Sequence, residues 1–372
     1  MENIKADSKL CQILSWIRDN GASDLHLQEG KPARYRTQGA LKIFSPDQVP
    51  TLAGDAFHQL FAENFSADTL ERIRHEFELD LSADMNGTRW RVNFSKQQGL
   101  QSCSFRIVPR QNLALRDLQL PPTLKDVANE PRGLVLLTGP TGQGKSTTVR
   151  AMLQDINLCQ AMRVITIEDP IEFIFEDALS QFEQREVGID TRTFADGIRN
   201  AMRQDPNIIF VGEIRDRESI FAALQAAETG HLVFTTLHAD SAAQAIARLR
   251  EHYPVAEQNM ISSLLARNLN MLVCQRLIPS VYNRRVPCLE IMKRDRTVQT
   301  AIQQNELHRL TEIIEVCTNQ GMHSFDQYLT ELLMAGVVTE AVAKTFAVNK
   351  HRLEMQLAGY QSSQSILLPE KH

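Results

Sequence analysis

The amino-acid sequence predicts an α/β protein: a doubly wound, mainly parallel sheet that carries a P-loop, with a small α+β domain before it and helices after it. Three observations lead to this prediction. Short apolar runs alternate with helical patterns through the middle of the 372-residue chain. A glycine-rich segment with the spacing of a phosphate-binding loop follows the first of those runs. The residues before them mix helical and alternating patterns, and the length favours two or three domains at about 150 residues each.

Residues 1–111 form the predicted α+β domain. Apolar side chains recur at spacings of three and four between residues 10 and 17, as on one face of an amphipathic helix. Residues 24–27 and 90–94 instead alternate polar with apolar side chains, which is the pattern of half-buried strands. The domain is predicted to end in a linker at residues 112–124, where two adjacent prolines disfavour helix and sheet alike.

Residues 125–296 form the predicted core domain. Its strands are continuous apolar runs at residues 134–138, 164–167, 208–211 and 232–236. Such runs, separated by helical patterns, indicate parallel strands that are buried on both faces. Functional side chains in such sheets lie at the carboxyl ends of the strands. Residues 297–372 are predicted to be helical and to end in a polar tail.

The segment GPTGQGKS at residues 139–146 fits GxxxxGK[ST], the P-loop. An apolar strand precedes it and a helix-compatible stretch follows, so backbone N–H groups and a helix N-terminus would converge on phosphate oxygens. Lys145 would neutralise the β- and γ-phosphates, and the Ser146 hydroxyl would bind Mg²⁺. The Gln143 side chain is expected to matter little, since backbone amides make the contacts. The predicted nucleotide-binding residues are Gly139, Pro140, Thr141, Gly142, Gln143, Gly144, Lys145, Ser146 and Thr147.

Hydrolysis needs a carboxylate that orients water or completes the metal shell, and the sequence offers it in two places. Glu213 lies just past the run at 208–211, as in a Walker B element, with Glu where Asp is usual. Glu168 and Asp169 end another predicted strand. His238 follows the carboxyl end of a third strand, where it could sense the γ-phosphate, whereas His231 opens that strand and is expected to pack.

Composition narrows the class of protein. Hydrophobic residues make up 43% and charged residues 23%, close to the averages of soluble globular proteins. The net charge of −5 gives no general attraction to nucleic acid, so no stable nucleic-acid partner is expected and DNA translocation is disfavoured. No apolar run approaches the length of a membrane span, and the first residues do not read as a signal peptide. We therefore expect a cytoplasmic protein with at most peripheral contact with membrane machinery.

Four segments in order carry a family resemblance: GPTGQGKST, TIEDPIEF, NIIFVGEIRDRES and TGHLVFTTLHAD. They resemble the Walker A, Asp box, Walker B and His box of the secretion-superfamily ATPases, and most of all those of the PilT-type retraction ATPases of type IV pili. ASDLH at residues 22–26, WRVN at 90–93 and GMHSFD at 321–326 resemble further signatures of that family. The resemblance thus extends over nearly the whole chain.

This resemblance implies a homo-hexameric ring that hydrolyses ATP with Mg²⁺. The hydrolysis would drive type IV pilus retraction, and so twitching motility, through an inner-membrane platform protein at the cytoplasmic face of the inner membrane. A PAS-like N-terminal domain would pack on the RecA-like domain of the neighbouring subunit, with ATP bound at the interface.

The resemblance also implies roles for single residues. Glu168 would be the water-activating acid and Glu213 the acid that acts at the metal, although these roles could be exchanged. Arg91 and Arg106 match N-terminal-domain arginines that the family brings to the phosphates. Further arginine candidates near the nucleotide or the interface are Arg199, Arg203 and Arg215.

One departure from the family pattern leaves alternatives open. Retraction ATPases typically carry AIRNLIRE after the core, whereas residues 297–304 read TVQTAIQQ, without those arginines. An accessory retraction ATPase or a specialised secretion or pilus-assembly ATPase is therefore an alternative. Assembly ATPases usually have a longer N-terminal extension and a four-cysteine metal site, which counts against assembly. A third interpretation is a non-hydrolysing, nucleotide-binding scaffold.

Overall fold

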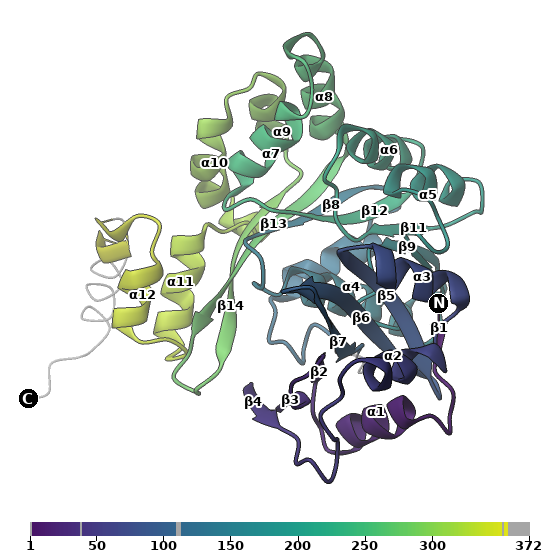
Figure 1. The fold of residues 1–372 in the computed structure, drawn as a ribbon. Coiled ribbons are helices and arrows are strands. Elements are labelled where there is room, and N and C mark those ends of the chain that lie inside the picture. The colour runs from purple at the N-terminus through teal and green to yellow at the C-terminus, as the bar shows by residue number, and fades with distance from the viewer. Residues whose placement is uncertain (1, 38, 109–112, 352, 356–372) are drawn as a thin grey trace, which may run out of the picture. The chain divides into compact units, whose positions relative to one another are not determined.

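The computed structural model describes residues 2–37, 39–108, 113–351 and 353–355, so the predicted polar tail lies outside the described residues. The chain divides into two compact units, traced in Figure 1. The first, here the N-terminal unit, comprises Met1–Gln111 with Asp169–Phe175. The second, here the core unit, comprises Asn112–Glu168 with Glu176–His372. None of the helices in the described ranges is both long enough and apolar enough to cross a membrane.

A sheet runs through the N-terminal unit in the order β1-β5-β6-β7-β2-β3-β4. Its elements are β1 (Glu2–Asn3), α1 (Lys9–Asp19), β2 (Asp24–Gln28), β3 (Arg34–Thr37), β4 (Ala40–Ile43), α2 (Asp55–Ala62), α3 (Ala67–His75), β5 (Glu78–Met85), β6 (Thr88–Gln97) and β7 (Leu100–Ile107). Alternation along β6 buries Trp90, Val92 and Phe94 on the face where apolar side chains of the three helices join one hydrophobic cluster. Arg91 and Asn93 lie on the opposite face, which is polar.

The core unit is built on a second sheet, in the order β10-β9-β11-β12-β8-β13-β14. Its strands are β8 (Gly133–Thr138), β9 (Arg163–Glu168), β10 (Gln181–Glu186), β11 (Ile208–Val211), β12 (Leu232–Leu237), β13 (Leu269–Pro279) and β14 (Arg285–Lys293). All neighbours are parallel except β13 and β14, which form an antiparallel hairpin. The four apolar runs correspond to β8, β9, β11 and β12, and the predicted α/β class with a mainly parallel sheet is confirmed.

Helices separate these strands and follow them toward the C-terminus (Figure 1). They are α4 (Lys145–Cys159), α5 (Phe194–Ala201), α6 (Arg217–Glu228), α7 (Ala242–Glu251), α8 (Val255–Asn268), α9 (Arg296–Gln303), α10 (Leu310–Val316), α11 (Phe325–Met334) and α12 (Glu340–Phe346). Polar caps define several starts: the side chains of Thr193, Asp216 and Ser241 each accept a hydrogen bond from a backbone N–H of the first turn. Ser324 and Gln327 form a capping box at the start of α11.

The expectation that Pro121 and Pro122 disfavour helical structure is wrong. A 3₁₀ helix covers Pro122–Asn129, with Pro121 as its N-cap. Proline suits a first helical position because the N–H that it lacks would have no partner there, and its fixed φ already fits. Gln160 Nε2 donates to Ala128 O (3.0 Å), so the short helix is tied to the end of α4.

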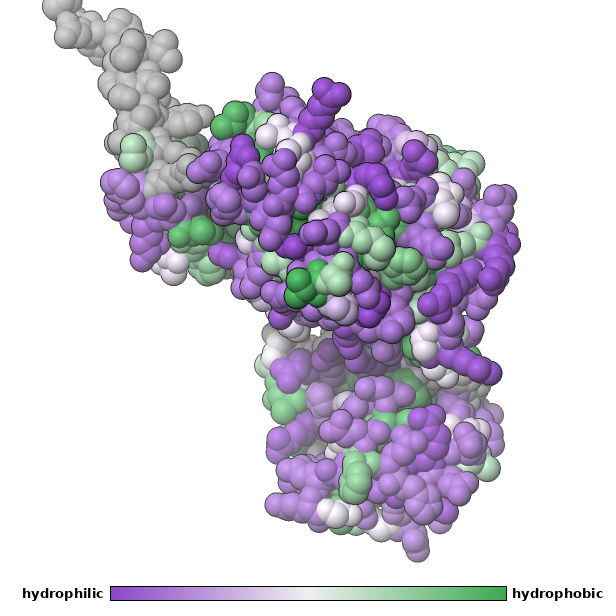
Figure 2. All heavy atoms as spheres, turned by 90° about the horizontal axis from the view of Figure 1, so that it is seen from above, coloured by the Kyte–Doolittle hydropathy of each residue, from purple (hydrophilic) through white to green (hydrophobic). Residues whose placement is uncertain are grey.

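The face drawn in Figure 2 is mostly hydrophilic, with small and separate apolar patches. Large apolar side chains that are exposed include Phe221 of α6 and Val255 and Met260 of α8. Single exposed apolar side chains are normal in folded proteins. Most apolar residues in the strands of the core unit are buried, whereas Leu41 and Ile43 of β4 in the N-terminal unit are exposed.

Candidate nucleotide-binding site

Strand β8, a glycine-rich loop and helix α4 form the phosphate-binding element that the motif predicts. β8 ends at Thr138, and α4 starts at Lys145 with Gly144 as its left-handed N-cap (φ +80°). Gly139 and Gly142 also have positive φ, +147° and +75°, which side chains disfavour. These glycines let the loop turn into the N-terminus of α4, where unpaired N–H groups and the helix dipole favour an anion.

Lys145 is held by the loop that precedes it. The residue is only 8% exposed. Its Nζ donates to the carbonyl oxygens of Gly139 (2.7 Å) and Pro140 (3.1 Å) and lies 3.4 Å from His238 Nδ1. Ser146, the next residue, is exposed, so its hydroxyl is accessible to a cation. A buried ammonium group beside an accessible hydroxyl fits a phosphate with bound Mg²⁺.

His238 connects Lys145 to an acid on a neighbouring strand. Its Nε2 lies 3.1 Å from Glu213 Oε1. A protonated lysine can only donate, so Nδ1 accepts from Lys145 and the imidazole proton sits on Nε2, which donates to the carboxylate. The three residues follow β8, β12 and β11, which are adjacent in the sheet. The carboxyl ends of three parallel strands thus bring together a lysine, a histidine and a glutamate that the sequence predicted separately.

Glu168 ends β9 and is 6% exposed. Its Oε1 accepts hydrogen bonds from Thr166 Oγ1 (2.6 Å) and from Gln184 Nε2 (3.2 Å). It lies beside Gly212, where an added Cβ would sit 3.5 Å from Glu168 Cα. Glu168 therefore occupies the strand edge next to Glu213, and two donors fix its carboxylate. Its predicted neighbour Asp169 instead begins the segment that belongs to the N-terminal unit.

The predicted arginines Arg91 and Arg106 are paired on the polar face of the N-terminal sheet. They lie directly opposite each other on β6 and β7. Arg106 Nε donates to Asp24 Oδ1 (2.6 Å), and Asp24 is buried. Burial alone would raise the pKa of Asp24, but hydrogen bonds from Ser23 and Arg106 outweigh it and hold that pKa below its usual value. The carboxylate therefore stays charged and orients one of the two guanidinium groups.

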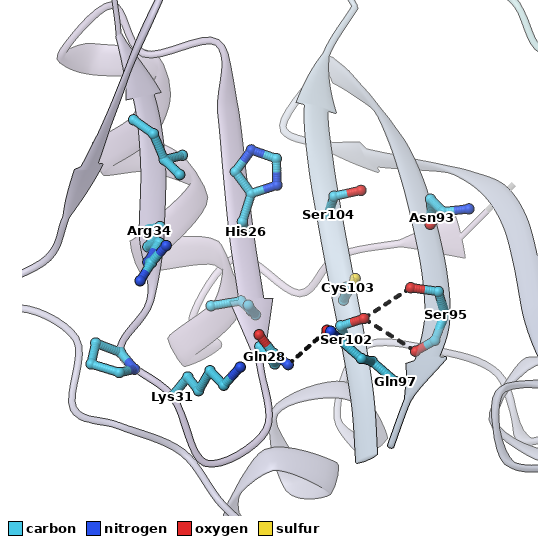
Figure 3. Close-up of a pocket in the computed structure, with 13 residues that line it drawn as sticks. His26, Gln28, Lys31, Arg34, Asn93, Ser95, Gln97, Ser102, Cys103 and Ser104 are labelled. Atoms are coloured by element: carbon cyan, nitrogen blue, oxygen red, sulfur yellow. Dashed lines mark hydrogen bonds between the residues drawn. The ribbon is translucent and has the colours of Figure 1, made fainter. Parts of the chain in front are cut away.

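A polar pocket of about 380 Å³ lies on the same face of this sheet (Figure 3). Lys31, Arg34 and His26 line it together with hydroxyl, amide and a few apolar side chains, and none of the described residues that line it carries a carboxylate. Burial, the largest effect, lowers the pKa of His26, so the imidazole is neutral at pH 7. The basic residues Lys31 and Arg34 therefore supply the positive charge of the pocket, which sequence reasoning missed.

The remaining candidate arginines are not brought together. Arg199 pairs with Asp196 of its own helix α5 (3.4 Å), and Arg203 lies beside Asn200 at the end of that helix (3.4 Å). Arg215 alone among them contacts the site residues above, because its Nη2 lies 2.7 Å from Glu213 Oε2. His231, expected to pack, contacts the carbonyl oxygen of Ala226 through Nδ1 (3.0 Å).

Strand β13 contributes residues that the sequence did not single out. Gln275 Nε2 donates to Gln143 O (2.7 Å), and Gln275 Oε1 accepts from Thr148 Oγ1 (2.7 Å). The Gln143 side chain, expected to matter little, accepts a hydrogen bond from Leu277 N (2.6 Å) through its Oε1. That expectation concerned only contacts to phosphate and stays a prediction; the side chain has a separate contact, which connects the loop to β13. The available signal was a polar residue, Gln275, at the end of the apolar run at residues 271–274.

Fold and site together define a RecA-like P-loop protein, a class that binds nucleoside triphosphates. The glycines of the loop leave room for phosphate, and hydroxyl and carboxylate oxygens such as those of Ser146 and Glu213 are of the kind that would suit Mg²⁺. A family model described as "Type II/IV secretion system protein" matches residues 6–366. The chain belongs to this family.

Several known proteins are similar to this chain. The type IV pilus retraction ATPase PilT of Pseudomonas aeruginosa is 37% identical over 336 residues, which cover 90% of this chain and 97% of that protein. The type IV pilus ATPase PilU of the same organism is 34% identical over 358 residues, 93% of this chain and 91% of that protein. The crystal structure of the pilus retraction motor PilT with bound ADP superimposes with a TM-score of 0.85 at 34% identity, covering 94% of this chain and 99% of that one.

Proposed function

We propose that this chain is a motor ATPase that hydrolyses ATP to drive type IV pilus retraction. One observation carries the enzymatic part of the proposal: the continuous contact from Lys145 through His238 to Glu213 at the carboxyl ends of three adjacent strands. This arrangement connects the lysine of the phosphate-binding loop to a carboxylate of the metal shell. A protein that only binds nucleotide has no need of that connection.

Each residue has a defined part in the proposed reaction. The N–H groups of the loop and Lys145 bind the phosphates, and Ser146 and Glu213 would hold Mg²⁺, which supplies charge neutralisation at the β- and γ-oxygens. Glu168 orients the attacking water and accepts its proton; its hydrogen bonds to Thr166 and Gln184 hold the carboxylate in position. Glu168 and Glu213 could exchange these roles, and the variants below separate them.

His238 is proposed to report the state of the γ-phosphate. A phosphate that draws the Lys145 ammonium toward itself weakens its contact with His238 Nδ1, and the imidazole then shifts relative to Glu213. Loss of the γ-phosphate would restore the contact. The site therefore has two arrangements that differ by one charged ligand, which is the requirement for a conformational switch.

Arg91 and Arg106 of the N-terminal unit are proposed to approach the phosphates when the domains close. A guanidinium delivered from a separate domain couples closure to γ-phosphate charge. Asp24 keeps Arg106 oriented for this role. The chain would act as a homo-hexamer with ATP at subunit interfaces, and would work on a pilus platform protein at the cytoplasmic face of the inner membrane.

A second candidate is an accessory retraction ATPase. It is favoured by the segment at residues 297–304, which forms most of α9 and lacks the arginines typical of retraction ATPases. An accessory ATPase would hydrolyse ATP by the same chemistry, because the two kinds of motor would differ in the surface that contacts the partner and not in the active site. Specialised secretion or pilus assembly remains a further alternative on the same chemistry.

A phosphate-release assay tests the enzymatic proposal. Wild type should turn over Mg²⁺-ATP, whereas Lys145→Ala should lose nucleotide affinity and turnover together, because the charge directed at the phosphates is gone. Glu213→Gln should keep binding and slow hydrolysis by orders of magnitude. Absence of turnover above the Lys145→Ala control would leave only the non-hydrolysing scaffold.

Counting surface pili by electron microscopy tests the direction of work. A strain without the gene should carry excess pili, and the wild-type gene should restore the normal number while Glu213→Gln should not. A surface without pili would indicate assembly instead. An unchanged count would favour the accessory or secretion role.

A further inference from the structure

We propose that Gln275 on β13 is a positioning residue that fixes the P-loop against the sheet and so sets the affinity of the site for nucleoside phosphates. The inference rests on the proposed function only in that the site takes ATP and ADP. It assigns a role to a residue outside the phosphate-binding motif, on a strand that follows the P-loop by more than a hundred residues in the sequence.

The side chain of Gln275 joins two parts of the phosphate-binding element. It is 2% exposed, so it has no access to bulk water as an alternative partner. Its amide donates to the carbonyl oxygen of Gln143 in the loop and accepts from the Thr148 hydroxyl on α4, both at 2.7 Å. A backbone carbonyl can only accept, which fixes the NH₂ group toward Gln143 and the oxygen toward Thr148.

Two glycines of the loop approach Gln275 so closely that a residue with a side chain would not fit at either position. A Cβ added to Gly139 would lie 2.3 Å from the backbone oxygen of Gln275, and one added to Gly144 would lie 2.9 Å from its Nε2. The first and last glycines of the loop therefore contact the same residue. Their lack of side chains serves this approach as well as access for phosphate.

A second contact holds the loop next to the first. Gln143 Oε1 accepts from Leu277 N at 2.6 Å, so Gln143 is held both through its backbone and through its side chain. β13 itself is paired with β8 up to Cys274, opposite Thr138, the last residue before the loop. The strand is thus fixed to the sheet immediately before it contacts the loop. The position of the loop N–H groups relative to α4 follows from this anchoring.

The expected effect is on binding and not on the chemical step. Within the described part of the chain, Gln275 forms no hydrogen bond with Glu168, Glu213 or His238, so the groups that act on water and metal keep their geometry without it. One lost hydrogen bond of this kind corresponds to roughly a two- to tenfold change in an equilibrium constant. Loss of both contacts should weaken nucleotide binding by about tenfold.

The test measures the Kd of the full-length chain for Mg²⁺-ADP by displacement of a fluorescent ADP analogue, together with kcat and KM for ATP. Gln275→Leu should raise Kd and KM about tenfold and leave kcat within about threefold. Thr148→Val removes one of the two contacts without changing the side-chain shape and should raise Kd by about two- to threefold. Gln275→Glu keeps the acceptor but places a carboxylate against a carbonyl, and should bind at least as weakly as Gln275→Leu.

Gln154→Leu is the matched control. Gln154 is equally buried, at 1% exposed, and lies on α4, but its side chain accepts a hydrogen bond from Asn157 of the same helix and not from the loop. This variant should keep the wild-type Kd. A wild-type Kd and KM in folded Gln275→Leu, a loss of kcat at constant KM, or an equal loss in Gln154→Leu would each overturn the proposal.

Other outcomes of the same experiment remain decisive. If Gln275→Leu does not fold, as judged by circular dichroism, Thr148→Val decides the question, because it alters only one contact on the same side chain. If wild type binds ADP without turning over ATP, the proposed function fails while the comparison of Kd values still tests Gln275.

Discussion

Acid should destabilise the core unit through His323, which lies just before α11. The residue is 9% exposed, and its ring stacks on Tyr328 with centroids 4.7 Å apart at 11°. Burial, the largest effect, lowers the pKa of His323 to about 4 from 6.5, and backbone groups of Leu289 and Ser324 offset only part of this shift. At pH 7 the imidazole is neutral in the folded and the unfolded chain, so its titration changes nothing there.

The sign and size of the effect follow from these two pKa values. As pH falls below 6.5 the unfolded chain takes up a proton that the folded chain binds only near pH 4, so the free energy of unfolding decreases over this window. A difference of about 2.5 pH units corresponds to about 3 kcal/mol, most of it already lost by pH 4.5. His323→Phe keeps a ring against Tyr328 and removes the titration, so this part of the acid sensitivity should disappear.

Urea unfolding at pH 7.5 and pH 4.5, followed by far-UV circular dichroism, measures the difference. Both tryptophans, Trp16 and Trp90, lie in the N-terminal unit, so tryptophan fluorescence reports that unit and serves as an internal control. Burial also raises the pKa of Glu290 on β14, but that residue is common to both proteins and cancels in the comparison. Equal loss of stability in wild type and His323→Phe between the two pH values would refute the reasoning.

Three further predictions concern the nucleotide site. Glu168→Gln should slow single-turnover phosphate release by a factor on the order of 10² to 10⁴ and leave the Kd for ATP unchanged, because a general base contributes to the chemical step and not to binding. A loss of ATP affinity would instead show that Glu168 has a structural role. Gly139→Ala should abolish binding of a fluorescent nucleotide, since its Cβ would lie 2.3 Å from a backbone oxygen, whereas Gly188→Ala, also at positive φ but with nothing within 4 Å, should bind normally. Asp24→Asn should lower the free energy of unfolding by less than about 1 kcal/mol, because the Arg106 side chain of the ion pair is 63% exposed. The same variant should reduce ATP turnover, because Asp24 no longer orients the Arg106 guanidinium. Full turnover would remove Arg106 from the proposed mechanism.

Local patterns predicted the strands that carry a clear apolar run or a clear alternation, and missed two strands of the core sheet for different reasons. β10 reads QFEQRE and lies at the edge of its sheet, where polar side chains are tolerated, so no apolar run marks it. β13 begins at Leu269, directly after α8 ends at Asn268, with no glycine or proline between them. An apolar segment that no glycine or proline separates from the preceding helix cannot be assigned to helix or strand from periodicity alone.

The residues of the candidate site likewise fall into those that the sequence predicts and those that it does not. Lys145, Glu213 and His238 could be predicted because each follows a recognisable strand, and parallel strands end at one edge of their sheet. Gln184 and Gln275 could not, because their importance lies in contacts with residues distant in sequence. Gln184 reaches Glu168 from the strand β10 that the pattern did not reveal. No local motif encodes which strand will lie beside the P-loop.

The contact between β13 and the P-loop also bears on how the chain is made. Gln143 and Gln275 are 132 residues apart in the sequence, so a nascent chain that has emerged only as far as α8 carries the complete GPTGQGKS motif without its partner strand. A contact between residues so far apart costs chain entropy to close, and it cannot form before the later strand has been made. The complete phosphate-binding element therefore forms late in synthesis, when β13 joins β8. Truncation before that strand would leave the whole motif without the strand that holds its loop.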